Sequence, residues 1–182
     1  MSKSHSNIRV QKDIMKLIMA GYQVDSTPEE PNTIYVHWNA PEGTPYYGFC
    51  FRIRVEFPQN YAYRSPSCGF ATHIYHTNVD FSSGSICLDV LSQNWSPMYN
   101  LNHVFDVFLQ QLLLYPNPND PLNGEAARLL LRNPEEYNKK ARAFCEQHAV
   151  RVENATKKVT LADKSEVEKV SYDDLSDVSD SD

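Results

Sequence analysis

The sequence predicts an α+β domain, because, after one N-terminal helix, segments with strand periodicity precede a series of segments with helical periodicity. Two stretches, 33–40 and 48–57, alternate apolar and polar residues, as antiparallel strands with one buried face do. Apolar residues at helical spacing dominate from residue 104 onward. The chain has 182 residues, 41% of them hydrophobic, which is enough for one domain and a modest extra segment.

One amphipathic helix is predicted before the strands, over residues 8–20. Its apolar face holds Val10, Ile14, Leu17 and Ile18. Asn7 is suited to cap the start of this helix, and Gly21 is suited to end it. The opposite side is basic and carries Arg9, Lys12 and Lys16. Such a basic side is typical either of a solvated face or of a binding surface, and the pattern alone favours neither.

The two predicted strands differ in the strength of their alternation. In 33–40 the apolar positions are Ile34, Val36 and Trp38. In 48–57 the alternation is stronger, and one face consists of Phe49, Phe51, Ile53, Val55 and Phe57. Residues 41–45 (Pro-Glu-Gly-Thr-Pro) have the composition of a turn between the strands, and 67–71 is predicted to be a further short strand.

Residues 72–99 show neither periodicity. The stretch is rich in Ser, Asn, Gly and Pro, and it contains His76, Asn78, Cys87, Asp89 and Trp95. An irregular stretch of this length is uncommon in a compact domain and usually serves function. We therefore expect the chemistry of the protein to lie here.

Three helices are predicted in the second half of the chain. The central one has a strongly apolar face formed by Val104, Phe105, Phe108, Leu109 and Leu112. A rigid, proline-rich connection follows at 115–122, and 123–132 is a short helix. The last helix begins with the cap, proline and acids of 133–136 and is predicted to run to about residue 153.

The C-terminal segment is acidic and loses all periodicity beyond about residue 156. Residues 154–182 hold eight acids and four lysines, while the whole chain has a net charge of -6. Residues 171–182 hold five Asp, four Ser and no basic residue. We therefore predict a core domain over residues 1–153 and an acidic, disordered tail over residues 154–182.

The composition argues against several classes of protein. No apolar run approaches the roughly 20 residues that span a bilayer, and the polar first residues do not resemble a signal peptide. We therefore expect a soluble protein of the cytoplasm or the nucleus. No basic stripe indicates nucleic-acid binding. The four cysteines lack the short spacings of zinc ligands, so we expect reduced thiols, no metal and no cofactor.

Cys87 is the candidate nucleophile, although a single Cys is more often a small buried hydrophobic residue. It lies within the irregular stretch, and His76 and Asn78 precede it. A Cys, a His and an Asn together can form a hydrolase site. The spacing alone leaves open whether Cys87 is a structural or a catalytic thiol.

Five separately spaced motifs resemble those of ubiquitin-conjugating enzymes. The active-site motif of that family is His-Pro-Asn, a glycine-containing loop and then the nucleophilic Cys. Here 75–78 reads Tyr-His-Thr-Asn, and Cys87 follows eleven residues after His76. Residues 41–48 resemble the family's hairpin, and 57–66 resemble its proline-rich strand exit. Residues 93–97 resemble its tryptophan loop, and 117–123 resemble the segment that faces the active site. Together the motifs cover about residues 8–150.

The resemblance implies the ubiquitin-conjugating (UBC) fold, with an N-terminal helix, a four-stranded antiparallel meander, a central helix and C-terminal helices. It implies an acyltransferase that accepts ubiquitin from the activating enzyme as a thioester on Cys87. With a ubiquitin ligase, the enzyme would pass ubiquitin to a lysine of a protein substrate. Segments 113–118, 120–127 and 132–137 are most similar to the H-type class, whose partner is the GID/CTLH-type ubiquitin ligase.

The resemblance also assigns catalytic positions. Cys87 would carry the thioester, and Asp120 would orient the incoming lysine and assist its deprotonation. Asn78 would stabilise the tetrahedral oxyanion or, alternatively, only brace the loop. Asp89 and Tyr75 match positions that line the same mouth.

Further positions follow from the same resemblance. His76 matches a residue that braces the active-site loop. Contacts with the activating enzyme and the ligase are assigned to Arg9, Lys12, Tyr63, Ser96, Pro97 and Met98.

The chain departs from the family's pattern at three places. Thr77 replaces the proline of His-Pro-Asn, so the loop is expected to be less rigid. Phe49 stands where the hairpin motif has its second glycine. Residues 61–63 read Tyr-Ala-Tyr instead of Tyr-Pro-Phe, which alters a surface that the family uses for ligases.

Two other functions are compatible with parts of the pattern. One is a non-catalytic, ubiquitin-binding relative of the same fold, but such relatives lack the nucleophile that Cys87 supplies. The other is a Cys/His hydrolase, for which the sequence shows no evident arrangement of a base.

Overall fold

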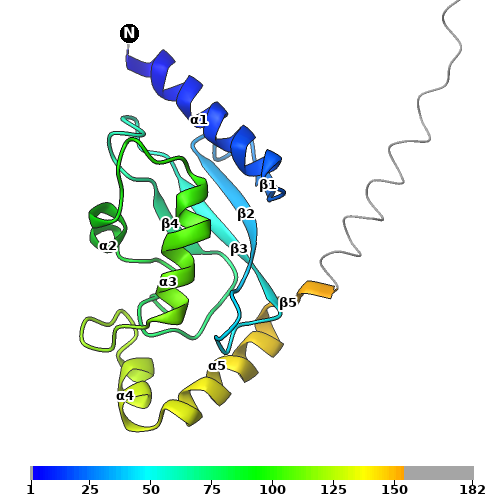
Figure 1. The fold of residues 1–182 in the computed structure, drawn as a ribbon, viewed down its shortest axis with the longest axis vertical. Helices are drawn as coiled ribbons and strands as arrows, with labels where there is room; N and C mark the ends of the chain where they lie inside the picture. The colour runs from blue at the N-terminus through cyan, green and yellow to red at the C-terminus, as the bar shows by residue number, and fades with distance from the viewer. Residues whose placement is uncertain (1, 154–182) are drawn as a thin grey trace, which may run out of the picture. The chain divides into compact units, whose positions relative to one another are not determined.

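The computed structural model describes residues 2–153, and only the backbone of residues 2–7. The predicted acidic tail, 154–182, lies outside the described residues. Figure 1 shows a long N-terminal helix, an antiparallel sheet and a series of helices that follow the sheet in the chain. The predicted α+β class is confirmed.

Helix α1 (Ser2–Met19) is the first element. The predicted start at residue 8 was wrong, since residues 2–7 contain no Gly or Pro that would stop the helix earlier. Its predicted end is confirmed, and Gly21 adopts a left-handed φ of 91° in the turn that follows. Leu17 and Asp13 on this helix are completely buried. The burial of a carboxylate shows that the inner face of α1 is not purely apolar.

The sheet is a meander of four antiparallel strands in the order β1-β2-β3-β4, as expected. Their bounds are Gln23–Ser26, Thr33–Asn39, Phe49–Glu56 and Ser67–Phe70. Strand β1 has no apolar alternation, and it is held by pairing with β2 rather than by its own pattern. A short fifth strand, β5 (Val150–Arg151), pairs with β3 and was not predicted.

The inner face of β3 forms the centre of the core. Its alternate residues, together with Phe57 just after the strand, are 0–7% exposed: Phe49, Phe51, Ile53, Val55 and Phe57. Phe49, which replaces a glycine of the family motif, has the guanidinium groups of Arg142 and Arg151 over its ring. These two contacts accommodate the larger side chain at the edge where β5 joins the sheet.

The irregular stretch 72–99 contains one short helix, α2 (Leu88–Gln93), which the sequence did not reveal. Two isolated bridges, Gly69 to Ser85 and Val79 to Ile86, attach the stretch to β4 and to itself. Gly84 has a φ of 71°, and a Cβ at this position would lie 1.9 Å from the carbonyl oxygen of Phe70. The loop can therefore approach β4 this closely only with a glycine.

The central helix begins with a π-helical turn, η1 (Val104–Phe108), and continues as α3 (Leu109–Leu114). Buried positions are Val104, Phe105, Phe108, Leu109 and Leu113. The prediction placed Leu112 in this set because it assumed a uniform α-helical period. The wider turn shifts the following residues, so that Leu113 is buried and Leu112 is only partly buried.

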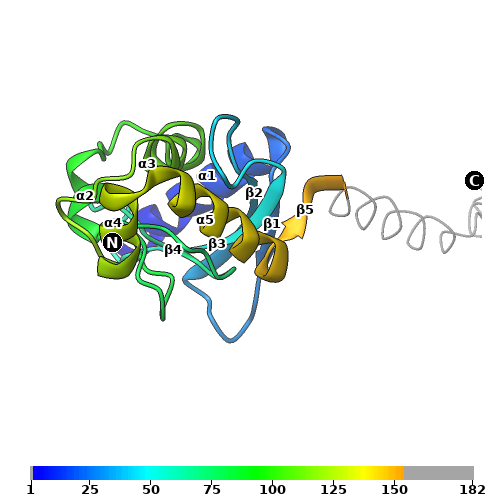
Figure 2. The same ribbon diagram turned by 90° about the horizontal axis from the view of Figure 1, so that it is seen from below.

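Two further helices, α4 and α5, follow the central helix. Figure 2 shows that α5 leads to β5. Helix α4 (Gly124–Arg132) is capped by Asn123, and α5 (Pro134–His148) is capped by Asn133. Each cap side chain accepts a backbone N–H three residues later. Helix α5 ends at His148, before the predicted end near 153, because β5 takes the next residues into the sheet.

Candidate active site

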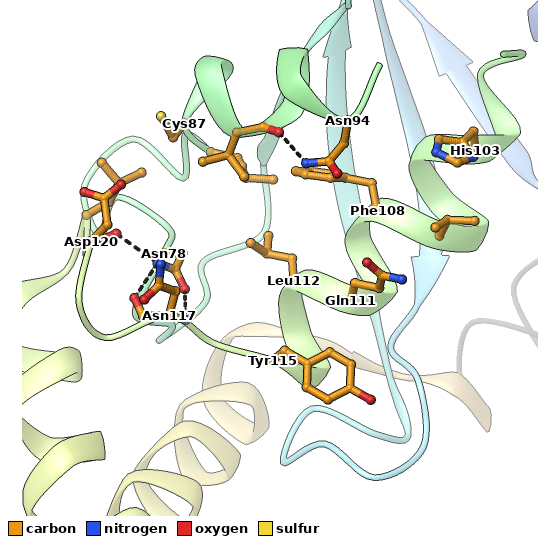
Figure 3. A pocket seen from close by; sticks show the side chains of 14 residues that line it. Asn78, Cys87, Asn94, His103, Phe108, Gln111, Leu112, Tyr115, Asn117 and Asp120 are labelled. Carbon is orange, nitrogen blue, oxygen red and sulfur yellow. Dashed lines mark hydrogen bonds between the residues drawn. The ribbon is translucent and has the colours of Figure 1, made fainter. Parts of the chain in front are cut away.

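Cys87 lies immediately before α2, at the rim of a pocket of about 270 Å³ (Figure 3). The thiol-bearing residue is half-buried. The pocket lies between α2, the central helix and the segment 115–122. Its walls are formed by Asn78, Ile86, Cys87, Val90, Asn94, His103, Val107, Phe108, Gln111, Leu112, Tyr115, Asn117, Asp120 and Leu122.

The other three cysteines are buried, so Cys87 is the accessible thiol of this chain. Burial raises the pKa of the Cys50 thiol. Burial raises the pKa values of Cys68 and Cys145 to about 12. Because the thiolate is the reactive form, these three residues are poor nucleophiles at neutral pH.

Asn78 joins the irregular stretch to the segment 115–122, as the dashed lines in Figure 3 show. Its Nδ2 donates to the backbone carbonyls of Asn117 at 2.8 Å and of Asp120 at 3.0 Å. Its Oδ1 accepts the backbone N–H of Asn117 at 2.7 Å. Both hydrogens of the side-chain amide are therefore bonded to protein carbonyls.

Asp120 is exposed and lines the same pocket as Cys87. Figure 3 shows the two side chains on the same side of the pocket. The backbone of Asp120 is held by Asn78, while its carboxylate remains at the pocket wall. Cys87 and Asn78 of the irregular stretch thus line one pocket with Asp120 of the segment 115–122.

His76 is completely buried and does not line the pocket. Its Nδ1 accepts the backbone N–H of Asn78 at 3.0 Å. Burial lowers the pKa of His76 to about 4, and the backbone of Leu112 opposes this effect. The ring is therefore neutral at physiological pH, and with Nδ1 as acceptor it carries its proton on Nε2.

Thr77, at the place of the family's proline, is also completely buried. Its carbonyl accepts the backbone N–H groups of Leu122 and Asn123, both at 3.0 Å. These bonds run beside those of Asn78. The irregular stretch and the segment before α4 are consequently joined at two successive residues.

Asp89 and Tyr75, expected at the same mouth, are not part of the pocket wall. Asp89 is exposed on α2 and faces a second hollow, which Arg64 and Ser92 also line. Tyr75 is only 2% exposed, and its hydroxyl donates to Glu125 at 3.4 Å. Neither residue therefore lines the pocket beside Cys87, although Asp89 lies only two residues after it in the chain.

The predicted partner-binding residues lie on α1 and on two loops that α1 contacts. Arg9 donates from Nη1 to the Pro97 carbonyl at 3.2 Å and from Nη2 to the Tyr99 carbonyl. Trp95 joins the two loops, because its Nε1 donates to the Ala62 carbonyl at 2.9 Å. Tyr63 and Met98 are among the most exposed apolar side chains, at 84% and 90%.

Arg9 is therefore not merely a solvated cation. Its Nε also donates to the buried carboxylate of Asp13 at 3.0 Å, and the Tyr61 hydroxyl donates to the same carboxylate oxygen at 2.6 Å. Lys12, by contrast, is exposed. Of the basic residues assigned to partners, Lys12 is the more available one.

Sequence reasoning missed several residues of the pocket wall, including Asn94, Gln111 and Leu112. Leu112 was expected in the core, and nothing in its neighbourhood signals a π-helical turn. Within residues 2–153, no helix is long and apolar enough to cross a membrane. In the same part of the chain, no three His, Cys, Asp or Glu side chains are placed to hold a metal ion.

An α+β fold with one accessible thiol beside an apolar pocket defines the chain as a candidate cysteine-dependent enzyme. Comparison with known proteins gives the particular class. A sequence model described as ubiquitin-conjugating enzyme matches residues 8–145. The chain therefore belongs to the ubiquitin-conjugating enzyme family, and it is a transferase.

Individual relatives agree with this assignment. The chain is 50% identical over 141 residues to ubiquitin-conjugating enzyme E2-23 kDa of Triticum aestivum, covering 78% of this chain and 77% of that protein. It is 42% identical over 148 residues to ubiquitin-conjugating enzyme E2-24 kDa of Saccharomyces cerevisiae, covering 81% and 68%. The ubiquitin conjugating enzyme E2 domain of Toxoplasma gondii has a TM-score of 0.72 and 28% identity, covering 79% of this chain and 99% of that one. The expected UBC fold is confirmed.

Proposed function

We propose that Cys87 accepts ubiquitin from the activating enzyme as a thioester and passes it, with a ubiquitin ligase, to a lysine of a protein substrate. The observation that carries this proposal is the accessibility of Cys87, at the rim of a pocket, while the other three thiols are buried. The alternative of a non-catalytic ubiquitin-binding module is not favoured, because it gives no reason for an accessible thiol at this place.

The loading step is a thiol exchange. The Cys87 thiolate attacks the thioester carbonyl on the activating enzyme, a tetrahedral oxyanion forms, and the thiolate of the activating enzyme leaves. One thioester is broken and one is formed, so the step needs little driving force. The thiolate rather than the thiol is the attacking form of the cysteine.

The transfer step requires a neutral amine. With a pKa near ~10.4, only about 1 in 2,500 lysines is neutral at pH 7. Lowering that pKa by one unit would increase the neutral fraction about tenfold. Asp120, on the pocket wall beside Cys87, is placed to orient the lysine and to take part in its deprotonation, while the apolar walls disfavour the charged form. The products are an amide and the free Cys87 thiol.

The hydrogen bonds of Asn78 bear on its two proposed roles, bracing the loop and stabilising the oxyanion. Its bonds to the backbone of Asn117 and Asp120 support a bracing role that holds Asp120 near Cys87. To stabilise the oxyanion, Nδ2 would have to release one of these carbonyls. We therefore propose that bracing is its role in the resting enzyme and that donation to the oxyanion follows release. His76, through its bond to the Asn78 backbone, braces the same loop.

The finer class is also a proposal. The amino-acid sequences of segments 113–118, 120–127 and 132–137 support the H-type class, and hence a GID/CTLH-type ligase as partner. Lys12, Tyr63, Ser96, Pro97 and Met98 would form the contact surface, and Arg9 would hold its loop in place.

Domain organisation and location complete the proposal. We expect residues 1–153 to form the catalytic core and 154–182 to form an acidic tail. We place the protein in the cytoplasm or the nucleus.

The experiment that tests the proposal is a loading reaction with activating enzyme, ubiquitin and ATP, analysed on a non-reducing gel. The natural chain should give an adduct that thiol reductants remove. Cys87→Ala should give none, and Cys87→Ser should give an ester that resists reductants. Cys50→Ala is the matched control for loss of a buried thiol and should load normally. A reductant-sensitive adduct on Cys87→Ala would contradict the assignment.

A further inference from the structure

The π-helical turn at the start of the central helix changes one backbone bond. The N–H of Leu109 bonds to the carbonyl of Val104, five residues earlier. In an α-helix this N–H would bond to the carbonyl of Phe105. The wide turn thus withdraws from Phe105 the partner that a regular helix would supply.

Trp38 supplies a replacement from the sheet. Its indole Nε1 donates to the Phe105 carbonyl at 3.2 Å. Trp38 lies on β2, paired with Phe51 of β3, and is only 3% exposed. The bond is therefore buried and runs from an inner strand of the sheet to the π-helical turn.

The residues after this turn form one wall of the pocket. Val107, Phe108, Gln111 and Leu112 all line it, opposite the rim that holds Cys87. Figure 3 shows Phe108, Leu112 and Gln111 along the central helix, across the pocket from Cys87. Because Leu113 is buried in place of Leu112, the π-helical turn decides which side chains face the pocket.

We propose that Trp38 is a positioning residue for the reaction at Cys87, acting through the Phe105 carbonyl to fix the pocket wall. Trp38 itself does not line the pocket. Loss of its N–H leaves the Phe105 carbonyl without this partner and allows the turn to revert towards α-helical bonding. Reversion rotates Leu112 and Gln111 relative to Cys87. The relevance to ubiquitin transfer rests on the proposed function, but the effect on the pocket does not.

The test replaces the Trp38 indole by benzothiophene, in Trp38→3-benzothienylalanine, which keeps the ring shape and removes the N–H. Alkylation of Cys87 is measured with an apolar reagent, N-phenylmaleimide, and a small polar one, iodoacetamide. With the natural chain, the rate of Cys87 alkylation should saturate as the N-phenylmaleimide concentration rises, because the reagent binds in the pocket before it reacts. In the variant, its half-saturating concentration should rise about 2- to 10-fold, the range expected for one buried hydrogen bond. The iodoacetamide rate should not change.

Two further variants separate positioning from general stability. Trp38→7-azatryptophan keeps the N–H donor and should restore the natural half-saturating concentration. Trp95→3-benzothienylalanine loses a bond of the same kind, to the Ala62 carbonyl, and neither Trp95 nor Ala62 lines the pocket. It should lower the unfolding temperature without changing the ratio of the two alkylation rates. The inference would be overturned if the Trp38 and Trp95 benzothiophene variants had the same ratio of N-phenylmaleimide to iodoacetamide alkylation rates while circular dichroism showed both chains to be folded.

The consequence for transfer is measured separately, as single-turnover discharge of the ubiquitin thioester to free lysine. The Trp38 benzothiophene variant should load normally, and its half-saturating lysine concentration should rise by a larger factor than its maximal discharge rate falls. If ubiquitin does not load on Cys87 in the natural chain, the proposed function fails while the alkylation result still decides the positioning role.

Discussion

The three hydrogen bonds of the Asn78 side chain are the most informative contacts at the residue scale. They connect the irregular stretch to the backbone on both sides of Pro118, and one of them holds the backbone of Asp120, which lines the same pocket as Cys87. A side chain with this geometry fixes the backbone of Asn117 and Asp120. On the proposed function, donation to the reacting carbonyl would require the release of one of these bonds.

Substitution of Asn78 separates the two roles. Asn78→Ala should lower the discharge rate about 10²–10³-fold, the usual effect of losing an oxyanion donor or its positioning. If bracing dominates, the amide of Asn117, which bonds to Oδ1, should also exchange with solvent faster. Asn78→Asp is the matched control, because it keeps an acceptor for that amide and loses both donors. Slow discharge with unchanged exchange at Asn117 in the alanine variant would rule out bracing.

His76 should make the stability of the fold depend on pH. In the unfolded chain a His titrates near ~6.5, while burial lowers the folded pKa to about 4. Between these values the unfolded chain binds a proton that the folded chain does not, so stability falls as the pH drops. Across the whole range between the two pKa values, the unfolding free energy should fall by about 3 kcal/mol. Urea unfolding between pH 7 and 4.5 should show a flatter profile for His76→Gln, whereas His73→Gln, which removes an exposed imidazole, should retain the slope.

Gly84 should tolerate no side chain. Its left-handed φ and the 1.9 Å approach of a Cβ to the Phe70 carbonyl predict that Gly84→Ala loses at least about 2 kcal/mol of unfolding free energy. Gly124→Ala is the control, since nothing lies within 4 Å of a Cβ there. Chemical denaturation should find its stability unchanged within about 1 kcal/mol. Equal stabilities of the two variants would contradict the close approach of the loop to β4.

At the scale of elements, α1 is connected through a buried carboxylate to the two loops that hold the predicted partner-binding residues. Asp13 accepts from Arg9 and Tyr61, and Arg9 continues to the carbonyls of Pro97 and Tyr99. The helix and the loops therefore form one surface, whose shape depends on bonds beneath it.

Substitutions of Arg9 and Lys12 should consequently have different effects on stability and on partner binding. Arg9→Ala should lower stability by about 1–3 kcal/mol, because Asp13 loses a partner, and should weaken binding of both the activating enzyme and the ligase. Arg9→Lys should not restore binding, since an ammonium cannot reproduce the planar fork. Lys12→Ala should weaken binding in a salt-dependent manner and leave stability unchanged. Calorimetric titration and thermal unfolding of the three variants check this, and a full rescue by Lys would contradict it.

The elements also show why some of the fold was predictable. Helix starts at Asn123 and Asn133 were predictable because a cap bonds to the backbone three residues away. The end of α5 was not predictable, because it depends on the pairing of β5 with β3, about a hundred residues earlier in the chain. The π-helical turn was missed for a similar reason, since its partner, Trp38, lies on the sheet.

At the scale of the whole molecule, the site is assembled from separate parts of the chain. Motif resemblance predicted that Cys87, Asn78 and Asp120 would meet, and the pocket contains all three. The same reasoning placed Asp89 and Tyr75 at this mouth, but neither side chain lines the pocket: Asp89 lines a second hollow, and Tyr75 donates to Glu125. A match by position fixes the backbone location of a residue, whereas the direction of its side chain depends on neighbours such as Glu125.

The most direct test of the central claim uses a chain in which Cys87 is the only cysteine. Cys50, Cys68 and Cys145 are replaced by Ala, and a second chain carries Cys87→Ala with the other three retained. Both are incubated with activating enzyme, ubiquitin and ATP, and their intact masses are measured before and after treatment with reductant. We predict one reductant-sensitive ubiquitin on the first chain and none on the second. Loading of the second chain, or no loading of the folded first chain, would contradict the assignment of Cys87.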